Sequence, residues 1–274
     1  MSGSMQLLGR TAVVTGAGGG IGRAISASLA RRGCHLALAD INPAGLAETA
    51  AMLGGGELRV STHALDVGDP KAIAAFPEQV AMLHGGADIL VNNAGVAIGG
   101  SFREVSEADF EWLFSINFWG VVRMTRAFLP LLQARPEARL VNLSSLFGLI
   151  APPGQTAYCA SKFAVRGFSE SLRHELAGTR VGVTVVHPGG VATGIARNAR
   201  IANAFTPEEV ERARASFEAK LKLAPETAGE VIVRGVEQRR ARVLVGSDAK
   251  LASVIERLAP TTYWNLLGRA FKAK

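Results

Sequence analysis

A tyrosine and a lysine four residues apart, Tyr158 and Lys162, are the side chains of this sequence best suited to proton transfer. On a helix, residues i and i+4 share one face, so the two side chains would be neighbours. An ammonium near a phenol favours the phenolate, which would lower the tyrosine pKa from its ordinary value of about 10. Ser145, 13 residues before the tyrosine, would hydrogen-bond the same substrate oxygen. Together they form an acid/base device for a carbonyl/alcohol pair.

The Tyr-x-x-x-Lys spacing also occurs by chance in many helices, where a surface lysine merely passes a half-buried tyrosine. The elements around it therefore matter. Arg139 to Leu143 has the apolar pattern of a strand that runs into paired serines, and Thr156 to Ala177 has a helical pattern. These elements would bring Ser145 and the Tyr/Lys pair to one place.

A glycine-rich turn lies near the start of the chain, between a strand at Thr11–Thr15 and a helix that continues to Arg32. In such a unit bare backbone approaches a pyrophosphate and the helix N-terminus favours its charge. The turn residues expected to hold a dinucleotide are Gly16, Gly20, Ile21 and Gly22. No Lys-Ser/Thr follows the glycines, which excludes a nucleoside-triphosphate loop.

The next predicted strand, His35–Ala39, ends in Asp40, 24 residues after the first glycine of the turn. That offset is typical of a carboxylate that accepts the ribose hydroxyls of NAD. The same charge repels a 2′-phosphate, and neither Gly19 nor Ile41 supplies a cation to offset it. Arg23 is expected to point along its helix. The sequence therefore favours NAD over NADP, and Ile41 is expected to be among the cofactor-binding residues.

Two further strands end in polar residues. Leu58–Leu65 is followed by Asp66 and Val67, which we expect at the adenine, and Asp88–Val91 by Asn92–Gly95. Alternating strands and helices predict a parallel sheet covered on both sides, whose ligands lie at the carboxyl ends of the strands. From the second of these runs we expect cofactor contacts by Asn93, Ala94 and Gly95.

The later chain carries the remaining features. Asn117 lies in an apolar helical pattern, where an amide is costly when unsatisfied; a helix bend or cap is the alternative to a functional role. A strand at Val181–Val186 precedes the residues Pro188, Gly189, Val191 and Thr193. The polar segment from about 191 to 223 is too long for a plain connection and is expected to be a substrate lid.

Composition narrows the class of protein. The chain has 274 residues, 48% of them hydrophobic and 19% charged, which is typical of one compact α/β domain. Its net charge of +7 is scattered, so we expect no nucleic-acid partner. The two cysteines are too few for a disulfide framework, which is typical of a reducing compartment. Neither a secretory signal nor a membrane span is expected, so the sequence favours a cytoplasmic location. We expect no metal.

Over residues 8 to 246 the chain resembles the short-chain dehydrogenase/reductase family, single-domain branch. The matching residues are Thr15-Gly16-x-x-x-Gly20-x-Gly22, Asp66, Asn92–Gly95, Asn117, Ser145, Tyr158-x-x-x-Lys162 and Pro188-Gly189-x-x-x-Thr193. This resemblance implies a doubly wound, mostly parallel seven-stranded Rossmann-type sheet with NAD across its carboxyl edge. It makes Tyr158 the acid/base and Lys162 the holder of the nicotinamide ribose. Ser145 would orient the substrate oxygen, and Asn117 would anchor a water in the proton relay.

Two departures from the family pattern stand out. His187 replaces a frequent Asn before Pro188, and we expect it to have a packing role. Gly18 and Gly19 replace small polar residues, which is expected to loosen the turn without removing its backbone donors.

The function expected is hydride transfer between NAD(H) and a hydrophobic alcohol or ketone, for example a lipid or steroid-like one. The alternative is a dinucleotide-sensing binding protein that has lost catalysis; the complete set of catalytic residues favours the enzyme. The residues expected around the substrate are nearly all apolar: Val96, Ala97, Ile98, Leu146, Phe147, Leu149, Ile150, Pro152, Gly190 and Val191.

We expect one domain over residues 1–246, followed by a C-terminal helical extension at 247–274. The extension mixes apolar, aromatic and basic residues. Packing on a neighbouring subunit or on the lid is favoured over contact with a membrane surface. The apolar helices at Glu104–Ala134 and Thr156–Ala177 predict a homo-oligomer, a dimer or tetramer.

Overall fold

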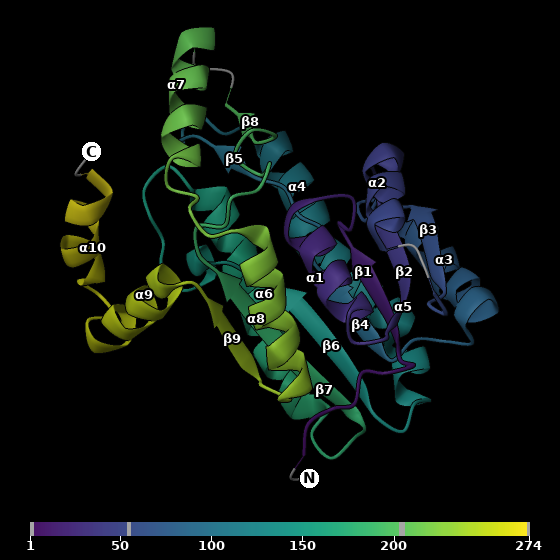
Figure 1. The fold of residues 1–274 in the computed structure, drawn as a ribbon. Coiled ribbons are helices and arrows are strands. Elements are labelled where there is room, and N and C mark those ends of the chain that lie inside the picture. Colours follow the sequence, from purple (N-terminus) through teal and green to yellow (C-terminus); the bar gives the residue numbers. More distant parts are fainter. Residues whose placement is uncertain (1–2, 54–55, 203–205, 273–274) are drawn as a thin grey trace.

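The computed structural model describes residues 3–53, 56–202 and 206–272, and the side chains of residues up to 268. Its centre is a seven-stranded sheet in the order β3-β2-β1-β4-β6-β7-β9, with every neighbouring pair parallel (Figure 1). The predicted doubly wound sheet is therefore confirmed. The strands are β1 (Thr11–Thr15), β2 (His35–Asp40), β3 (Val60–Ala64), β4 (Ile89–Asn92), β6 (Ala138–Leu143), β7 (Val181–Pro188) and β9 (Arg242–Val245).

Helices cover both faces of the sheet. One face is covered by α1 (Gly20–Ala30), α2 (Pro43–Leu53) and α8 (Pro225–Glu237), and the other by α3 (Pro70–His84), α5 (Val121–Gln133) and α6 (Thr156–Glu175). Outside these layers lie α4 (Glu107–Phe114), α7 (Pro207–Glu218), α9 (Ser247–Leu258) and α10 (Tyr263–Lys272) (Figure 1).

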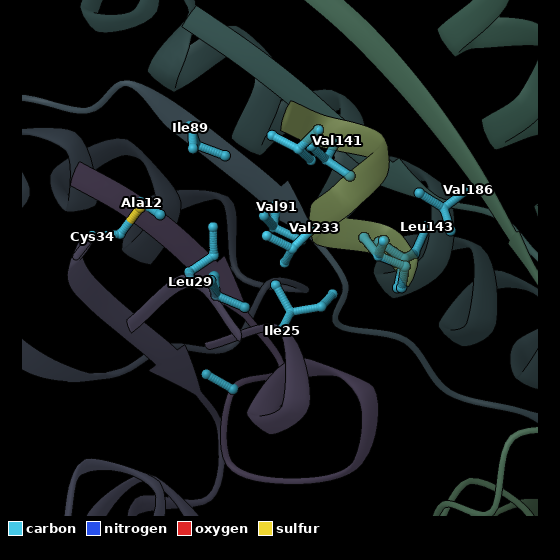
Figure 2. Close-up of a cluster of buried hydrophobic side chains, with 14 of the residues drawn as sticks. Ala12, Ile25, Leu29, Cys34, Ile89, Val91, Val141, Leu143, Val186 and Val233 are labelled. Carbon is cyan, nitrogen blue, oxygen red and sulfur yellow. The ribbon is translucent and has the colours of Figure 1, made fainter. Parts of the chain in front are cut away.

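The core is split by the alternation of side chains along each strand. On β1, Ala12 and Val14 pack with α1 and α8, whereas Val13 packs on the opposite face with α3 and α5. Because both faces are covered, the strands are apolar on both sides, which explains their short continuous hydrophobic runs. In Figure 2, Val233 of α8 lies beside Val91 of β4. A helix from late in the chain thus packs in the core formed by the first strands.

The junction of α1 with α8 joins segments about 200 residues apart. A Cβ on Gly229 would lie 2.6 Å from the carbonyl carbon of Ala24, so only glycine allows the two helix backbones to approach this closely. The guanidinium of Arg32 pairs with the Glu230 carboxylate at 2.7 Å across the same junction. Helix α1, which begins at the glycine turn, is therefore held in place by α8.

The predicted helical pattern around Asn117, within Glu104–Ala134, is not a regular α-helix at that residue. A π-helix at Ser115–Gly120 joins α4 to α5, and the helix ends at Gln133. The wider turn places the amide of Asn117 against the backbone of Val96, which an unbroken apolar pattern does not reveal.

Other differences are small. A two-stranded sheet of β5 (Ile98–Gly99) and β8 (Arg200–Ile201) was not predicted, because two-residue strands leave no periodic pattern. The predicted strand Leu58–Leu65 is shorter at both ends, as β3. Helices α9 and α10 lie within the segment expected to be an extension. Residues 203–205 of the expected lid and 273–274 of that segment lie outside the described residues.

Candidate active site

A cavity of about 1330 Å³ opens at the carboxyl ends of β1, β4, β6 and β7. The glycine turn and Asp40 line one part of it, and apolar residues of the loop after β6 line another. Ser145, Tyr158 and Lys162 lie at the same cavity. The structure thus brings the predicted phosphate-binding turn and the predicted acid/base residues to one site.

The serine and tyrosine predicted to be catalytic, Ser145 and Tyr158, come from consecutive elements. Strand β6 ends at Leu143, and Ser145 then caps a short 3-10 helix, its hydroxyl accepting a hydrogen bond from Phe147 N at 3.1 Å. Helix α6 presents Tyr158, whose hydroxyl is hydrogen-bonded to the Ser145 side chain. Two hydroxyls are therefore available to one substrate oxygen.

Lys162 lies one turn further along α6 and is buried. Its Nζ is 5.7 Å from the centre of the Tyr158 ring and donates a hydrogen bond to the Leu143 carbonyl at 3.2 Å. With one such bond, the ammonium keeps further donors for a ligand in the cavity.

The pKa values of this pair correct one expectation. Burial raises the pKa of Tyr158 to about 12, although the hydrogen bond from Ser145 opposes the rise. Burial also lowers the pKa of Lys162 to about 8. The predicted lowering of the Tyr158 pKa is wrong for the structure as it stands, because the loss of water on burial is the largest cause and it raises the pKa. The phenol is thus a proton donor at neutral pH; additional positive charge beside it would be needed to favour the phenolate.

Asn117 is fully buried next to the site and does not line the cavity. Its Oδ1 accepts from Val96 N at 2.8 Å, and its Nδ2 donates to Val96 O at 2.9 Å and to Ser161 Oγ at 3.2 Å. The side chain thereby ties the loop after β4 to helix α6. The anchoring of a water by Asn117 stays a prediction, and its side-chain amide is engaged by Val96 and Ser161.

The side chain of Asn93 is hydrogen-bonded to the backbone at the start of the glycine turn. Its Nδ2 donates to the carbonyls of Thr15 and Gly16 at 2.9 and 3.2 Å. A Cβ on Gly22 would lie 2.0 Å from the Gly16 carbonyl oxygen, so this position has no room for any side chain. The glycine turn is consistent with a bound pyrophosphate, because no side chain separates its backbone from the cavity.

Asp40 lies at the cavity end of β2, where its two oxygens accept from Gly18 N at 2.8 Å and Asn42 N at 2.9 Å. A Cβ on Gly18 would come within 2.9 Å of the Asp40 carboxylate. Gly18 therefore tightens the contact between turn and carboxylate, and the expected loosening at this position is wrong. Arg23 donates to Gly18 O and pairs with Glu48, so it is held against α2.

The sequence profile described as "short chain dehydrogenase" matches residues 10–204. The chain belongs to the short-chain dehydrogenase/reductase family. It is 43% identical over 262 residues to the "Putative oxidoreductase SadH" of Mycobacterium tuberculosis, covering 94% of each chain. The "Oxidoreductase UcpA" of Escherichia coli is 41% identical over 207 residues, which cover 75% of this chain and 78% of that one.

Among solved structures, a short-chain dehydrogenase/reductase from Burkholderia phymatum in complex with NAD is similar to this chain. The TM-score is 0.86 at 30% identity, covering 93% of this chain and 95% of that one. These relatives confirm the predicted family and the prediction of an oxidoreductase, against the alternative of a non-catalytic sensor.

Most of the residues predicted to bind the cofactor line the cavity. Those lining the cavity are Gly16, Gly20, Ile21, Asp40, Ile41, Asn93, Ala94, Gly95, Tyr158, Lys162, Pro188, Gly189, Val191 and Thr193. Three do not line it. Gly22 lies behind the turn, Asp66 accepts from Gly68 N at 2.7 Å, and Val67 is buried against Gly120.

The predicted substrate residues divide in the same way. Lining the cavity are Val96, Ala97, Leu146, Phe147, Ile150, Gly190 and Val191, whereas Ile98, Leu149 and Pro152 do not line it. The side chains that we had not predicted come from α6, the lid and the C-terminal extension, among them Gln155, Phe217, Asp248, Leu251, Ala252 and Leu267. An apolar stripe in the extension was visible in the sequence, but what it packs against was not.

Among the described residues, no group of three or more His, Cys, Asp and Glu side chains is placed to hold a metal ion. In the same part of the chain, no helix has the length and hydrophobicity to span a bilayer.

Proposed function

We propose that this short-chain dehydrogenase transfers a hydride between NAD(H) and the carbinol or carbonyl carbon of a hydrophobic alcohol or ketone. The observation that carries the proposal is the hydrogen-bonded pair of Ser145 and Tyr158 hydroxyls. This pair lies in one cavity with the glycine turn and with apolar walls. Such a pair suits a substrate oxygen that must exchange a proton.

In this proposal each side chain has one task. In reduction, Tyr158 gives its proton to the carbonyl oxygen; in oxidation it takes the proton of the alcohol. Ser145 donates to the same oxygen and orients it, and Lys162 holds the nicotinamide ribose. Asn117 keeps the loop after β4 and α6 in register. The dinucleotide, when bound, supplies or accepts the hydride.

The choice of NAD rests on the end of β2. Asp40 presents a carboxylate to the cavity, and Ile41 follows it with its side chain 69% exposed. A 2′-phosphate placed there would meet a negative charge. Arg23, a nearby cation in α1, is engaged by Gly18 and Glu48.

The substrate class rests on the apolar part of the cavity. Leu146, Phe147, Ile150 and Cys159 form a buried cluster with Tyr158 packed against it. A hydrocarbon attached to the reacting carbon would be desolvated there, whereas a sugar or hydroxy acid would leave polar groups unpaired.

We further propose the organisation expected from the sequence: one domain over 1–246 with a lid at about 191–223, an extension over 247–274, a cytoplasmic location and a homo-oligomer. The oligomer is supported by Trp119 and Phe163, large apolar side chains that are 48% and 38% exposed on the surface of the helical layer.

The test is a panel of alcohols with NAD and of ketones with NADH, followed by NADH absorbance. Polycyclic and long-chain substrates are expected to give higher kcat/KM than sugars and small hydroxy acids, by about 1–3 kcal/mol for each buried feature. Equal or better activity on the polar substrates would overturn the substrate class.

A further inference from the structure

The C-terminal helix pair, α9 and α10 (residues 247–272), is attached to both rims of the cavity. At one rim the Asp248 carboxylate accepts a hydrogen bond from Gly190 N at 2.7 Å, in the turn after β7. At the other rim the Tyr263 hydroxyl accepts from Ala151 N at 3.0 Å, in the loop after β6. The two anchors come from different helices and reach different loops. The helix pair therefore bridges the cavity.

Between the two anchors the helix pair presents apolar side chains to the cavity. Leu251 and Ala252 of α9 and Leu267 of α10 line it. Leu267 is 8% exposed and belongs to the buried cluster that also contains Phe147. Its neighbour Leu266 is 62% exposed and does not line the cavity. One helix thus has a residue in the cavity wall and a matched residue outside it.

We propose that this helix pair is the outer wall of the substrate pocket and sets the length of hydrocarbon chain that the enzyme accepts. The inference rests on the proposed alcohol/ketone function. Tyr158 packs against the same cluster as Leu267, so a chain attached to the reacting carbon extends toward this wall. Neither Leu267 nor Ala252 belongs to the sequence motifs that identify the family, and both lie in the C-terminal helix pair.

The experiment uses straight-chain 2-ketones from four to ten carbons with NADH. For the wild type, kcat/KM should rise by about fourfold for each methylene that reaches the wall. Leu267→Ala should lower kcat/KM for 2-decanone by about tenfold while changing 2-butanone less than twofold. Leu266→Ala, the matched control, should leave both within twofold.

Two further variants test the wall without removing an apolar contact. Ala252→Leu fills the pocket, so it should shift the optimum to shorter ketones. Tyr263→Phe removes the anchor at Ala151, so it should flatten the dependence on chain length. If Leu267→Ala does not fold, Ala252→Leu decides the matter. The proposal is overturned if Leu267→Ala lowers activity on short and long ketones equally, or if Ala252→Leu leaves the optimum unchanged.

A binding measurement separates this inference from the proposed function. Calorimetric titration of the same ketones into the NADH-loaded Tyr158→Phe variant measures affinity without turnover. If ketones are reduced at rates that do not depend on chain length, the proposed function is supported and the proposed role of the helix pair as pocket wall is refuted. A second outcome is that the wild type reduces no ketone, while affinity still rises with chain length and drops when Leu267→Ala is added. The proposed function is then refuted, and the proposed role of the helix pair as pocket wall is supported.

Discussion

The imidazole of His187 donates a hydrogen bond from Nδ1 to the carbonyl oxygen of Ser145 at 2.9 Å. The ring is fully buried at the end of β7, beside the serine that we propose to orient the substrate. Burial lowers the pKa of His187 to about 4, with the charges of Arg242 and Arg166 in the same direction, although the bond to Ser145 opposes this. The ring is therefore neutral at physiological pH, and its packing role includes holding the serine backbone.

This histidine makes stability depend on pH. The unfolded chain binds a proton at His187 below about pH 6.5 and the folded chain only near pH 4, so stability is present above 6.5 and is lost as pH falls toward 4. Between pH 7 and 5 the loss from this group should be about 2 kcal/mol. Urea unfolding at both pH values should show a smaller loss for His187→Asn. The exposed His174→Asn serves as control; identical losses in all three proteins would refute the assignment.

Tyr158→Phe keeps the ring and removes only the hydroxyl. Turnover should fall by at least ~10²–10⁴, typical of an acid/base group, while NADH binding, followed by fluorescence, stays within a few-fold. The chain has one other tyrosine, Tyr263, which provides a matched control. Tyr263→Phe should retain turnover on 2-butanone. Turnover of Tyr158→Phe within threefold of wild type would show that another group transfers the proton.

Lys162→Met should reduce both turnover and cofactor affinity, because the ammonium serves the ribose and the proton transfer. Since burial lowers the pKa of Lys162 to about 8, the wild type should bind NAD more weakly as pH rises through 8. The methionine variant should lack this step. Titrations of NAD between pH 6.5 and 9.5 measure it, and a step of equal size in both proteins would assign it to another group.

Asp40→Ala combined with Ile41→Arg should shift preference toward NADP, because a charge-assisted contact replaces repulsion of the 2′-phosphate. The ratio of kcat/KM for NADP and NAD measures the shift. Ile41→Arg alone, with the carboxylate retained, should give a smaller change. A wild type that already prefers NADP would contradict the role given to Asp40.

The oligomer prediction is tested on the helical surface. Light scattering at micromolar protein should return a dimer or tetramer mass for the wild type. Trp119→Glu or Phe163→Glu should lower that mass, because a charge would be placed in an apolar interface. Leu8→Glu, at an exposed position near the N-terminus, should not. A monomeric wild type would refute the prediction.

Much of the site was predictable because its residues lie at ends of strands, where short motifs and sheet topology together fix position. The glycine turn, Asp40 and Ser145 belong to this class, whereas Tyr158 was found by its spacing from Lys162 on a helix. What the sequence did not reveal depends on contacts between distant segments. The side chain of Asn117, in the π-helix, is hydrogen-bonded to the backbone of Val96. Gly18 has no room for a side chain because the Asp40 carboxylate lies close to it.

The pKa of Tyr158 was mispredicted for a related reason: spacing along a helix reports a neighbouring lysine but not the loss of water around both groups. Likewise, the stripe in the extension indicated burial, but its partner, the cluster around Phe147, lies about 100 residues earlier in the chain.

The contact between α1 and α8 bears on how the protein is made. During synthesis helix α1 emerges early, but its Ile25 and Leu29 remain uncovered until Val233 of α8 has left the ribosome. Glu230, the carboxylate that pairs with Arg32, arrives equally late. The first half of the sheet therefore cannot mature as the chain lengthens, and the nascent protein carries an open apolar surface over most of its translation, which is the stage at which chaperones act.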